Sequence, residues 1–309
     1  MKIAFRIDIG SETGTGHFVR MSALADVFTD LGYICEFFTE EDEHIDYNGF
    51  DLIIVDTYKV SNDYIKNLNA PNRTLVCYDD NALYTYSCDM LVNANLYANE
   101  LKFKFGAKTP KLLLGGEYAL LRREFREAKP IVIKENANTI FVCFGGTDLH
   151  NTTPRTIKTL CQIDGVYLNV VLGKYTKNDE EVLLFAEKYG KDRVKVHKTP
   201  KSMVEIMQKC DIAVTSSGSM IYEVAALGLP AITIKQADNQ NFVTEYMSRN
   251  NLIESVGDWN NVDLSNLKQK VAALLSNYKQ RLILSKRLTE QVNKNGAVKV
   301  VQEIVASRS

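Results

Sequence analysis

Several features that would assign this sequence to a simple class are missing. Its 309 residues carry a formal net charge of -1 with scattered lysine and arginine, so nothing points to binding of nucleic acid or a membrane surface. No apolar run approaches the ~20 residues that span a bilayer. The six cysteines form no CxxC pair and most lie in apolar strand-like runs, so we expect reduced core residues.

Histidine is also scarce. His44, His150 and His197 show no metal-ligand spacing, so we expect neither a metal nor a cofactor. A strand-like run already begins at Ile3, so we expect no signal peptide and a cytoplasmic protein. Protein partners cannot be inferred from these patterns.

Short β-rich runs alternate with helical patterns along the chain, without repeats. The apolar residues of 17–31 recur at helical spacing, and Gly32 predicts the end of that helix. Because a parallel strand pair needs a crossover connection, the alternation predicts an α/β fold with parallel sheets. The expected strands are 3–8, 34–38, 51–56, 74–78, 90–92, 112–114, 139–144, 167–172, 194–197, 212–215 and 231–234.

A polar stretch at 127–138, which contains Pro130, interrupts the alternation. We therefore expect a Rossmann-like domain at 1–128, a second one at 138–290 and a C-terminal helix at 291–309, within a tail that is helical by pattern from 278 to 306. Ligands of open α/β sheets bind beyond the carboxyl ends of the strands. In a two-domain version, those edges face one another across a cleft.

The first candidate site is the glycine loop before His17. Gly10, Gly14 and Gly16 allow close approach of the backbone to a ligand, but Val19 occupies the third glycine position of the dinucleotide motif, and the loop would also suit any strand-to-helix turn. A helix N-terminus disfavours imidazolium, so a neutral His17 could act as a general base. The alternative is a histidine that caps its own helix or fills a pocket.

Three loops of the second half have comparable chemistry. Gly145 and Gly146 follow a strand, although Thr147 or Asp148 could simply cap the next helix. The loop 215–219 offers hydroxyls and unencumbered N–H groups for a diphosphate, and Glu223 could accept bonds from ribose hydroxyls or be an acid favoured by the helix dipole. The amides of 236–241 suit sugar hydroxyls and N-acetyl groups, or form an ordinary polar loop.

Taken together, these stretches resemble the PseG family of UDP-sugar hydrolases in pseudaminic acid biosynthesis, relatives of MurG-type glycosyltransferases with the two-domain GT-B fold. The resemblance runs from the first strand to about Met247. It rests on FRIDIGSETGTGHFVRM, YDD at 78–80, CDMLVNAN at 88–95, GGEYALLRREF at 115–125, FGGTDLHN at 144–151, SSGSMIYEVAALGLP at 216–230 and the pair Asn239-Gln240.

The resemblance implies hydrolysis of UDP-2,4-diacetamido-2,4,6-trideoxy-β-L-altropyranose, with inversion and without a metal. His17 matches the catalytic histidine, Glu223 the ribose-binding carboxylate, and Asn239 and Asn151 substrate-contacting amides. Gly145, Gly146, Ser217 and Gly218 are expected along the diphosphate. The other expected substrate-binding residues are Asp8, Gly14, Gly16, Arg20, Tyr78, Asp79, Ser219 and Gln240. Ile9, Gly10 and Thr13 depart from the family on the sugar side, which leaves the exact sugar open.

Two groups of acidic residues remain. Asp8, Asp79 and Asp80 end strands on the same edge, where they could orient His17, hold the sugar or form turns, while the acidic run 40–43 is expected to be a solvated loop. Two other functions stay open: a MurG-like glycosyltransferase, and a non-catalytic protein that binds a sugar nucleotide.

Overall fold

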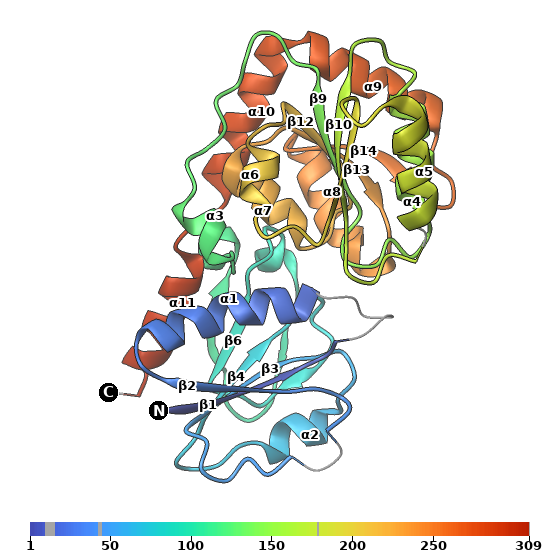
Figure 1. The fold of residues 1–309 in the computed structure, drawn as a ribbon. Coiled ribbons are helices and arrows are strands. Elements are labelled where there is room, and N and C mark those ends of the chain that lie inside the picture. The colour runs from blue at the N-terminus through green and yellow to red at the C-terminus, as the bar shows by residue number, and fades with distance from the viewer. Residues whose placement is uncertain (10–15, 43–44, 178, 309) are drawn as a thin grey trace. The chain divides into compact units, whose positions relative to one another are not determined.

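The computed structural model describes residues 1–9, 16–42, 45–177 and 179–308. The chain divides into two compact units (Figure 1). Unit 1 comprises Met1–Arg126 together with Asn293–Ser309, and unit 2 comprises Glu127–Val292. The C-terminal segment thus belongs to the unit that contains the N-terminus.

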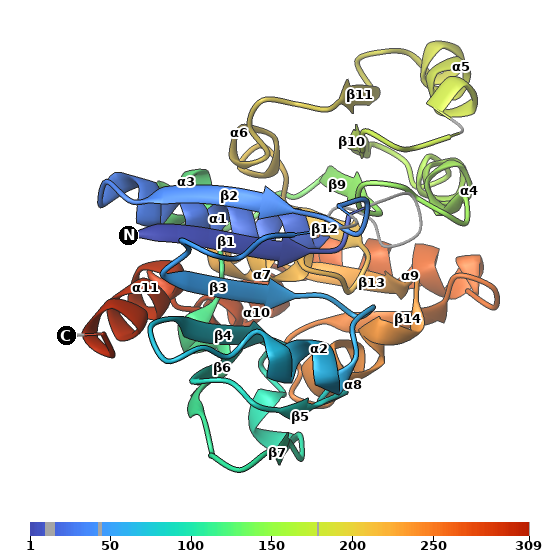
Figure 2. The same ribbon diagram turned by 90° about the horizontal axis from the view of Figure 1, so that it is seen from below.

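Unit 1 is built on a six-stranded parallel sheet in the order β2-β1-β3-β4-β6-β8 (Figure 2). Chain order reverses once, between β1 and β3, where Ile7 pairs with Asp56. The strands are β1 (Lys2–Ile7), β2 (Ile34–Phe38), β3 (Leu52–Asp56), β4 (Thr74–Tyr78), β6 (Met90–Asn93) and β8 (Lys111–Leu114), with a separate pair β5 (Thr85–Tyr86) and β7 (Lys104–Phe105).

Apolar side chains cover both faces of this sheet, as expected of a parallel sheet. Ile3, Phe5 and Ile7 of β1 point into a core formed with α1 and α11, whereas Ala4 belongs to the opposite core, which includes Ile65 of α2. The helical elements of unit 1 are α1 (Gly16–Asp30), α2 (Asn62–Asn67), α3 (Arg123–Glu127) at its end, α11 (Gly296–Ala306), and the 3-10 turns η1 (Ala98–Glu100) and η2 (Gly116–Tyr118). The predicted stop of α1 is confirmed, because Gly32 has a positive φ of 79°.

Unit 2 has its own six-stranded parallel sheet, in the order β11-β10-β9-β12-β13-β14. Chain order reverses between β9 and β12, where Cys143 pairs with Thr215. Its elements are β9 (Thr139–Cys143), α4 (Thr152–Leu160), β10 (Tyr167–Leu172), α5 (Asp179–Tyr189), β11 (Val194–Lys198), α6 (Val204–Met207), β12 (Ile212–Thr215), α7 (Met220–Leu227), β13 (Ala231–Lys235), η3 (Asp238–Gln240), α8 (Asn241–Arg249), β14 (Glu254–Asp258), α9 (Leu264–Ser276) and α10 (Tyr278–Gln291). The predicted α/β alternation is therefore confirmed in both units.

The C-terminal tail is helical, as its pattern predicts, but it is not continuous. It forms two helices, α10 and α11, which Val292–Asn295 separate. Gly296 begins α11 against η2: a Cβ at this position would lie 2.3 Å from the backbone nitrogen of Ala119. Helical periodicity did not reveal the break, because both segments carry the same pattern and only the contact with Ala119 requires a glycine.

The Arg281 side chain links the segment that leads into β9 to the end of helix α9. The side chain is fully buried (0% exposed), and burial lowers the pKa of its guanidinium. It donates to the carbonyl oxygens of Leu274 and Leu275 near the end of α9 and to those of Lys134 and Glu135 in the segment that leads into β9. One cation therefore satisfies four backbone acceptors.

Replacing Arg281 with Met should destabilise unit 2 by about 3 kcal/mol, because hydrogen bonds to charged groups contribute about 1.5–3 kcal/mol and the carbonyls lose their donor. Urea unfolding followed by the fluorescence of Trp259, the sole tryptophan, reports on this unit. Lys286→Met on the exposed side of α10 is the matched control and should change stability by less than about 0.5 kcal/mol. Equal effects of the two substitutions would refute the role given to Arg281.

Candidate functional site

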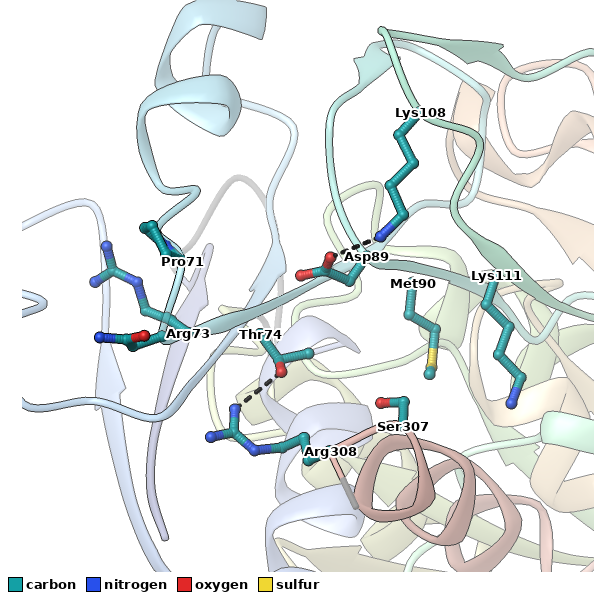
Figure 3. A pocket seen from close by; sticks show the side chains of 10 residues that line it. Pro71, Arg73, Thr74, Asp89, Met90, Lys108, Lys111, Ser307 and Arg308 are labelled. Carbon is teal, nitrogen blue, oxygen red and sulfur yellow. Dashed lines mark hydrogen bonds and ion pairs between the residues drawn. The ribbon is translucent and has the colours of Figure 1, made fainter.

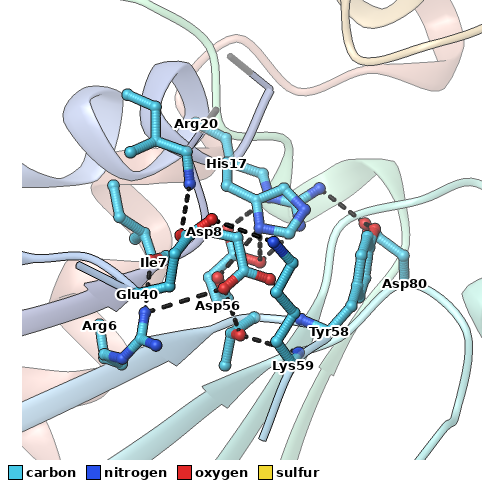
Figure 4. A network of polar contacts seen from close by, with 12 residues as sticks. Arg6, Ile7, Asp8, His17, Arg20, Glu40, Asp56, Tyr58, Lys59 and Asp80 are labelled. Atoms are coloured by element: carbon cyan, nitrogen blue, oxygen red, sulfur yellow. Dashed lines mark hydrogen bonds and ion pairs between the residues drawn. The ribbon is translucent and has the colours of Figure 1, made fainter. Parts of the chain in front are cut away.

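His17 lies at the point where the chain order of the unit 1 sheet reverses. It is the second residue of α1 and only 5% exposed. Its Nδ1 is 3.0 Å from the carbonyl oxygen of Asp56 and 3.6 Å from the Asp56 carboxylate (Figure 4). The ring of Tyr58 meets the imidazole edge-on, with 4.6 Å between ring centroids. The acid beside His17 is therefore Asp56, which the sequence analysis did not single out.

The contact with Asp56 assigns the proton of a neutral His17. A carbonyl oxygen only accepts hydrogen bonds, so Nδ1 must carry the hydrogen in this interaction. Nε2 of the neutral imidazole then has the free lone pair. The contact that fixes this tautomer comes from Asp56, and it requires none from Asp8, Asp79 or Asp80.

Arg20 lies three residues after His17 on α1 and bridges two buried acids. Its Nε and Nη2 donate to the two carboxylate oxygens of Asp56 at 2.7 and 2.5 Å, and Nη1 donates to Asp80 at 2.7 Å. Its guanidinium lies 4.3 Å from the centroid of the Tyr78 ring. Burial opposes its charge, but Asp56 and Asp80 raise the pKa of Arg20 well above its usual value.

Asp80 is bonded on both oxygens. Besides Arg20, it accepts from the hydroxyl of Tyr58 at 2.6 Å and from Nδ2 of Asn95 at 2.7 Å. Burial alone would raise its pKa, yet Arg20 and the Tyr58 hydroxyl bring the pKa of Asp80 below its usual value. Asp80 is thus an ionised member of a buried network.

Asp8 and Asp79 serve the neighbouring loops. Asp8 accepts from the hydroxyl of Thr57 at 2.5 Å and from the backbone N–H of Tyr58 at 2.7 Å. Asp79 accepts from the backbone N–H groups of Asn81 and Ala82, which is the turn role left open above. Burial raises the pKa of Asp79.

Glu40 corrects the expectation of a solvated acidic loop. Its carboxylate accepts from the backbone N–H of Ile9 at 3.1 Å and pairs with Lys59 at 3.1 Å, so it takes part in the network of Figure 4. A run of four acids in the sequence gives no sign that one of them folds inward. The sequence analysis also did not single out Asp56, Tyr58 and Asn95, because their roles depend on side chains that are distant in the sequence. Asp56 ends an apolar strand, in the same way that Asp8 follows one.

The chain order of the unit 2 sheet reverses between β9 and β12, and the expected glycine-containing loops follow these two strands. Gly145 has a φ of 85°, which favours glycine. The side chain of Asp148 accepts from the backbone N–H groups of Thr152 and Thr153 at 2.9 and 3.0 Å, so it caps α4. Asn151 is exposed with a left-handed φ of 51°. Since a carboxylate already occupies the start of α4, this helix end is unsuited to a second anion.

The loop between β12 and α7 has a different character. Ser217 is fully buried, and its hydroxyl has no hydrogen-bond partner among the described residues. Ser219 precedes α7 without a side-chain cap bond within that part of the chain. Gly218 has no positive φ, and an added Cβ would meet Nε2 of Gln240 only at 3.5 Å. The fold itself therefore does not require glycine at this position. Glu223 lies buried (6% exposed) on α7.

Loops after β9, β13 and β14 are tied together beside these turns. The His150 ring stacks on Trp259 with 3.5 Å between centroids, and its Nε2 contacts the carbonyl oxygen of Gln236 at 3.1 Å. Gln240 accepts from the backbone N–H of Gln236 at 3.0 Å, whereas Asn239 is exposed. Gln240 thus holds the loop in which Asn239 projects to the surface.

Some expected residues contribute only through backbone position or fall outside the structure. Gly16 begins α1, Gly146 accepts from the backbone N–H of Tyr175 at 2.9 Å, and Gly14 lies outside the described residues. Among the residues that are described, no group of three or more His, Cys, Asp or Glu side chains could hold a metal ion. Nor is any helix in the described ranges long and apolar enough to cross a membrane.

A cavity of about 410 Å³ in unit 1 lies away from these residues (Figure 3). Thr74, Met90 and Lys111, which line it, are the first residues of their strands. The cavity is thus at the amino ends of the strands, opposite the edge at which ligands of such sheets bind. Of the four cationic residues that line it, Lys108 pairs with Asp89, Lys111 with Glu303 and Arg308 with Asp51.

Comparison with known proteins gives the family. Residues 139–304, more than half of the chain, match the glycosyltransferase family 28 C-terminal domain. The chain belongs to this family. Crystalline MurG of Acinetobacter baumannii has a similar fold, with a TM-score of 0.63 at 14% identity over 99% of this chain and 100% of that one. This likeness confirms the predicted GT-B class.

Two relatives narrow the comparison. An uncharacterized protein of Methanocaldococcus jannaschii is 29% identical over 276 residues, or 78% of this chain; the chain spans only 57% of that protein. A UDP-2,4-diacetamido-2,4,6-trideoxy-β-L-altropyranose hydrolase of Campylobacter jejuni is 24% identical over 81% of this chain and 97% of its own length. Together with the fold, these matches support a nucleotide-sugar-processing enzyme.

Replacing Asp80 with Asn should flatten the acid side of the stability profile of the protein. An acid whose pKa is lowered by folding stabilises above its unfolded pKa of about 4, and that contribution is lost as the pH falls through the folded value. The variant should be less stable than the wild type at pH 7 and lose less on acidification. Urea unfolding followed by circular dichroism measures this, with Trp259 fluorescence reporting on unit 2 separately.

Asp79→Asn is the neighbouring control with the opposite sign. Folding raises the pKa of Asp79, so its ionisation opposes folding as the pH rises. The stability difference between wild type and variant should therefore shrink toward neutral pH for Asp79→Asn and grow for Asp80→Asn. The same trend in both variants would contradict the two assignments.

Proposed function

We propose that this protein hydrolyses UDP-2,4-diacetamido-2,4,6-trideoxy-β-L-altropyranose, or a close UDP-diacetamido sugar, to UDP and the free sugar. The observation that carries the proposal is the 3.0 Å contact from Nδ1 of His17 to the carbonyl oxygen of Asp56. In the neutral ring this contact holds the proton on Nδ1, and the lone pair of Nε2 can then accept a proton from water. The printed activity of the Campylobacter jejuni relative supports this chemistry.

In the proposed reaction, His17 removes a proton from water as its oxygen bonds to the anomeric carbon. The bond from that carbon to the diphosphate oxygen breaks, and UDP leaves with the electron pair. A well-placed general base contributes about 10²–10⁴-fold in rate. The proposal assigns binding of UDP to unit 2 and the role of general base to His17 of unit 1.

The loop after β12 is the proposed diphosphate site. The first N–H groups of a helix lack intrahelical partners, and its positive dipole end attracts anions. At α7 these groups adjoin the buried hydroxyl of Ser217, which has no hydrogen-bond partner in the described part of the chain, whereas Asp148 already caps α4. The proposal therefore places the diphosphate at Ser217, Gly218 and Ser219, where α7 also stabilises charge that develops on the leaving group.

The remaining roles follow from position. Glu223 on α7 is proposed to accept hydrogen bonds from the ribose hydroxyls. Asn151 and Asn239 are exposed amides on loops at the carboxyl edge and are proposed to contact the sugar. Gly145 and Gly146 leave the neighbouring turn without side chains near the diphosphate.

A second candidate is transfer of the sugar to an acceptor instead of water. The match to a glycosyltransferase family and the likeness to MurG favour it. The same His17 would then deprotonate an acceptor hydroxyl, so the two reactions differ in the acceptor and not in the base.

Incubation of the protein with the UDP-sugar in ¹⁸O-water, without an acceptor, separates these functions. Hydrolysis at carbon should release free sugar that carries the label, with unlabelled UDP. Label in UDP would mean attack at phosphorus, and an intact substrate would leave transfer or simple binding. His17→Asn is the control: it should lose about 10²-fold or more of the turnover and still bind UDP. Unchanged turnover in this variant would exclude His17 as the base.

Gly218→Ala tests the diphosphate site. The added methyl group meets its nearest described neighbours at ordinary van der Waals distance, so stability should hardly change. It would, however, occupy the approach of the diphosphate, and calorimetry should show UDP affinity reduced by about tenfold or more, which corresponds to ~1.4 kcal/mol. Gly165→Ala, at a positive φ of 73° in the loop before β10, is the control: backbone strain of about 1–2 kcal/mol should appear as lost stability while UDP affinity is retained. Undiminished UDP affinity in Gly218→Ala would place the diphosphate elsewhere.

A further inference from the structure

The buried charged side chains around His17 bond mainly to one another, an arrangement that the sequence did not reveal. The Arg20, Asp56 and Asp80 side chains are 11%, 1% and about 10% exposed, respectively. Three of the five guanidinium donors bond to carboxylates, and one guanidinium face is covered by Tyr78. Arg20 is therefore bonded mainly to protein groups.

Asp56 reaches His17 in two ways with different consequences. Its backbone carbonyl oxygen, 3.0 Å from Nδ1, selects the tautomer with a free Nε2. Its carboxylate, 3.6 Å from the same atom, would by itself favour the protonated ring, because an opposite charge within about 4–6 Å stabilises the charged form. A protonated Nε2 could not accept a proton from water. The carbonyl thus favours a base, and the carboxylate opposes it.

Arg20 offsets that second effect. It binds both oxygens of the Asp56 carboxylate, one of them at the 2.5 Å distance on the side that faces His17. We propose that Asp56 and Arg20 are positioning residues: Asp56 orients His17 through its carbonyl group, and Arg20 neutralises the Asp56 carboxylate and so limits the attraction of that carboxylate for a proton on the imidazole. This inference rests on the proposed function only in giving His17 the role of base.

Asp80 competes with Asp56 for the positive charge of the Arg20 guanidinium. It shares the guanidinium and is itself held by Tyr58 and Asn95. Loss of Asp80 would leave Arg20 to act on Asp56 alone, and loss of Arg20 would expose both carboxylates to His17. The two changes should therefore move the protonation of His17 in opposite directions. Among the residues that the structure describes, the ionisable side chains of the surrounding network are Arg6, Asp8, Arg20, Glu40, Asp56, Tyr58, Lys59, Tyr78 and Asp80.

The test follows His17 itself in the ligand-free protein. With only four histidines in the chain, the side-chain ¹⁵N signals of His17 can be assigned by their loss in His17→Asn. In wild type we expect the neutral ring to carry its proton on Nδ1. In Arg20→Met, which keeps the apolar stem, protonation of His17 should occur at a pH higher by about one unit or more. In Asp80→Asn it should occur at a lower pH than in wild type.

The pH dependence of kcat provides a second, independent test. The acid limb of kcat should move with the NMR titration in each variant, while UDP affinity stays unchanged. If Arg20 instead binds substrate, Arg20→Met would raise KM and leave both titration and acid limb in place, which overturns the inference. Should Arg20→Met not fold, Asp80→Asn decides alone: an unchanged His17 titration there also refutes the proposal. Because the NMR experiment needs no turnover, absence of hydrolysis would refute the proposed function without affecting this result.

Discussion

Parallel strand pairing is the constraint on which the rest of this structure depends. Each parallel pair needs a crossover, so all carboxyl ends of a sheet come to one edge, and the loops there diverge where chain order reverses. In unit 1 that point lies between β1 and β3, and in unit 2 between β9 and β12. His17 and Asp56 meet at the first point, and the Gly145 turn and Ser217 adjoin the second.

The polar side chains at the two edges are satisfied in different ways. At the edge of unit 1, buried acids and cations are paired with one another, so its side chains are held rigidly before any substrate binds. Burial of such a cluster costs desolvation energy, and apolar replacements of buried ion pairs are often neutral or stabilising. Stability alone therefore does not explain its presence beside His17, whereas the role proposed for His17 does. The β12–α7 loop of unit 2 instead leaves a buried hydroxyl without a partner among the described residues.

Much of this arrangement follows from the sequence, and the exceptions have identifiable causes. Apolar runs such as 52–55 and the glycine at 32 predict their strands and helix end, because burial and positive φ are local requirements. Strand β14 was missed, since Glu254–Asp258 contains one buried apolar residue, Val256, and owes its conformation to pairing with β13. Local sequence patterns cannot show that a segment becomes a strand because another part of the chain pairs with it.

The same distinction applies to the candidate site. His17, Ser217 and Glu223 stand out because their residue types at a strand end or helix start are informative by themselves. The role of Asp56 depends on its neighbours: its backbone carbonyl faces His17 across 39 positions of sequence, and its carboxylate faces Arg20. Any residue could supply that carbonyl, so no sequence pattern marks it.

The return of the C-terminus to unit 1 makes unit 2 an insertion within the chain of its companion. Ala297, Val300, Val301 and Ile304 of α11 complete the core that Ile3 and Phe5 begin. During synthesis, unit 2 has all of its residues before unit 1 does, although unit 1 contains the N-terminus. Until α11 has been made, the core that these strands share with α1 lacks one of its sides. The histidine site, which α1 and β3 form, therefore rests on a core that only the last residues of the chain complete.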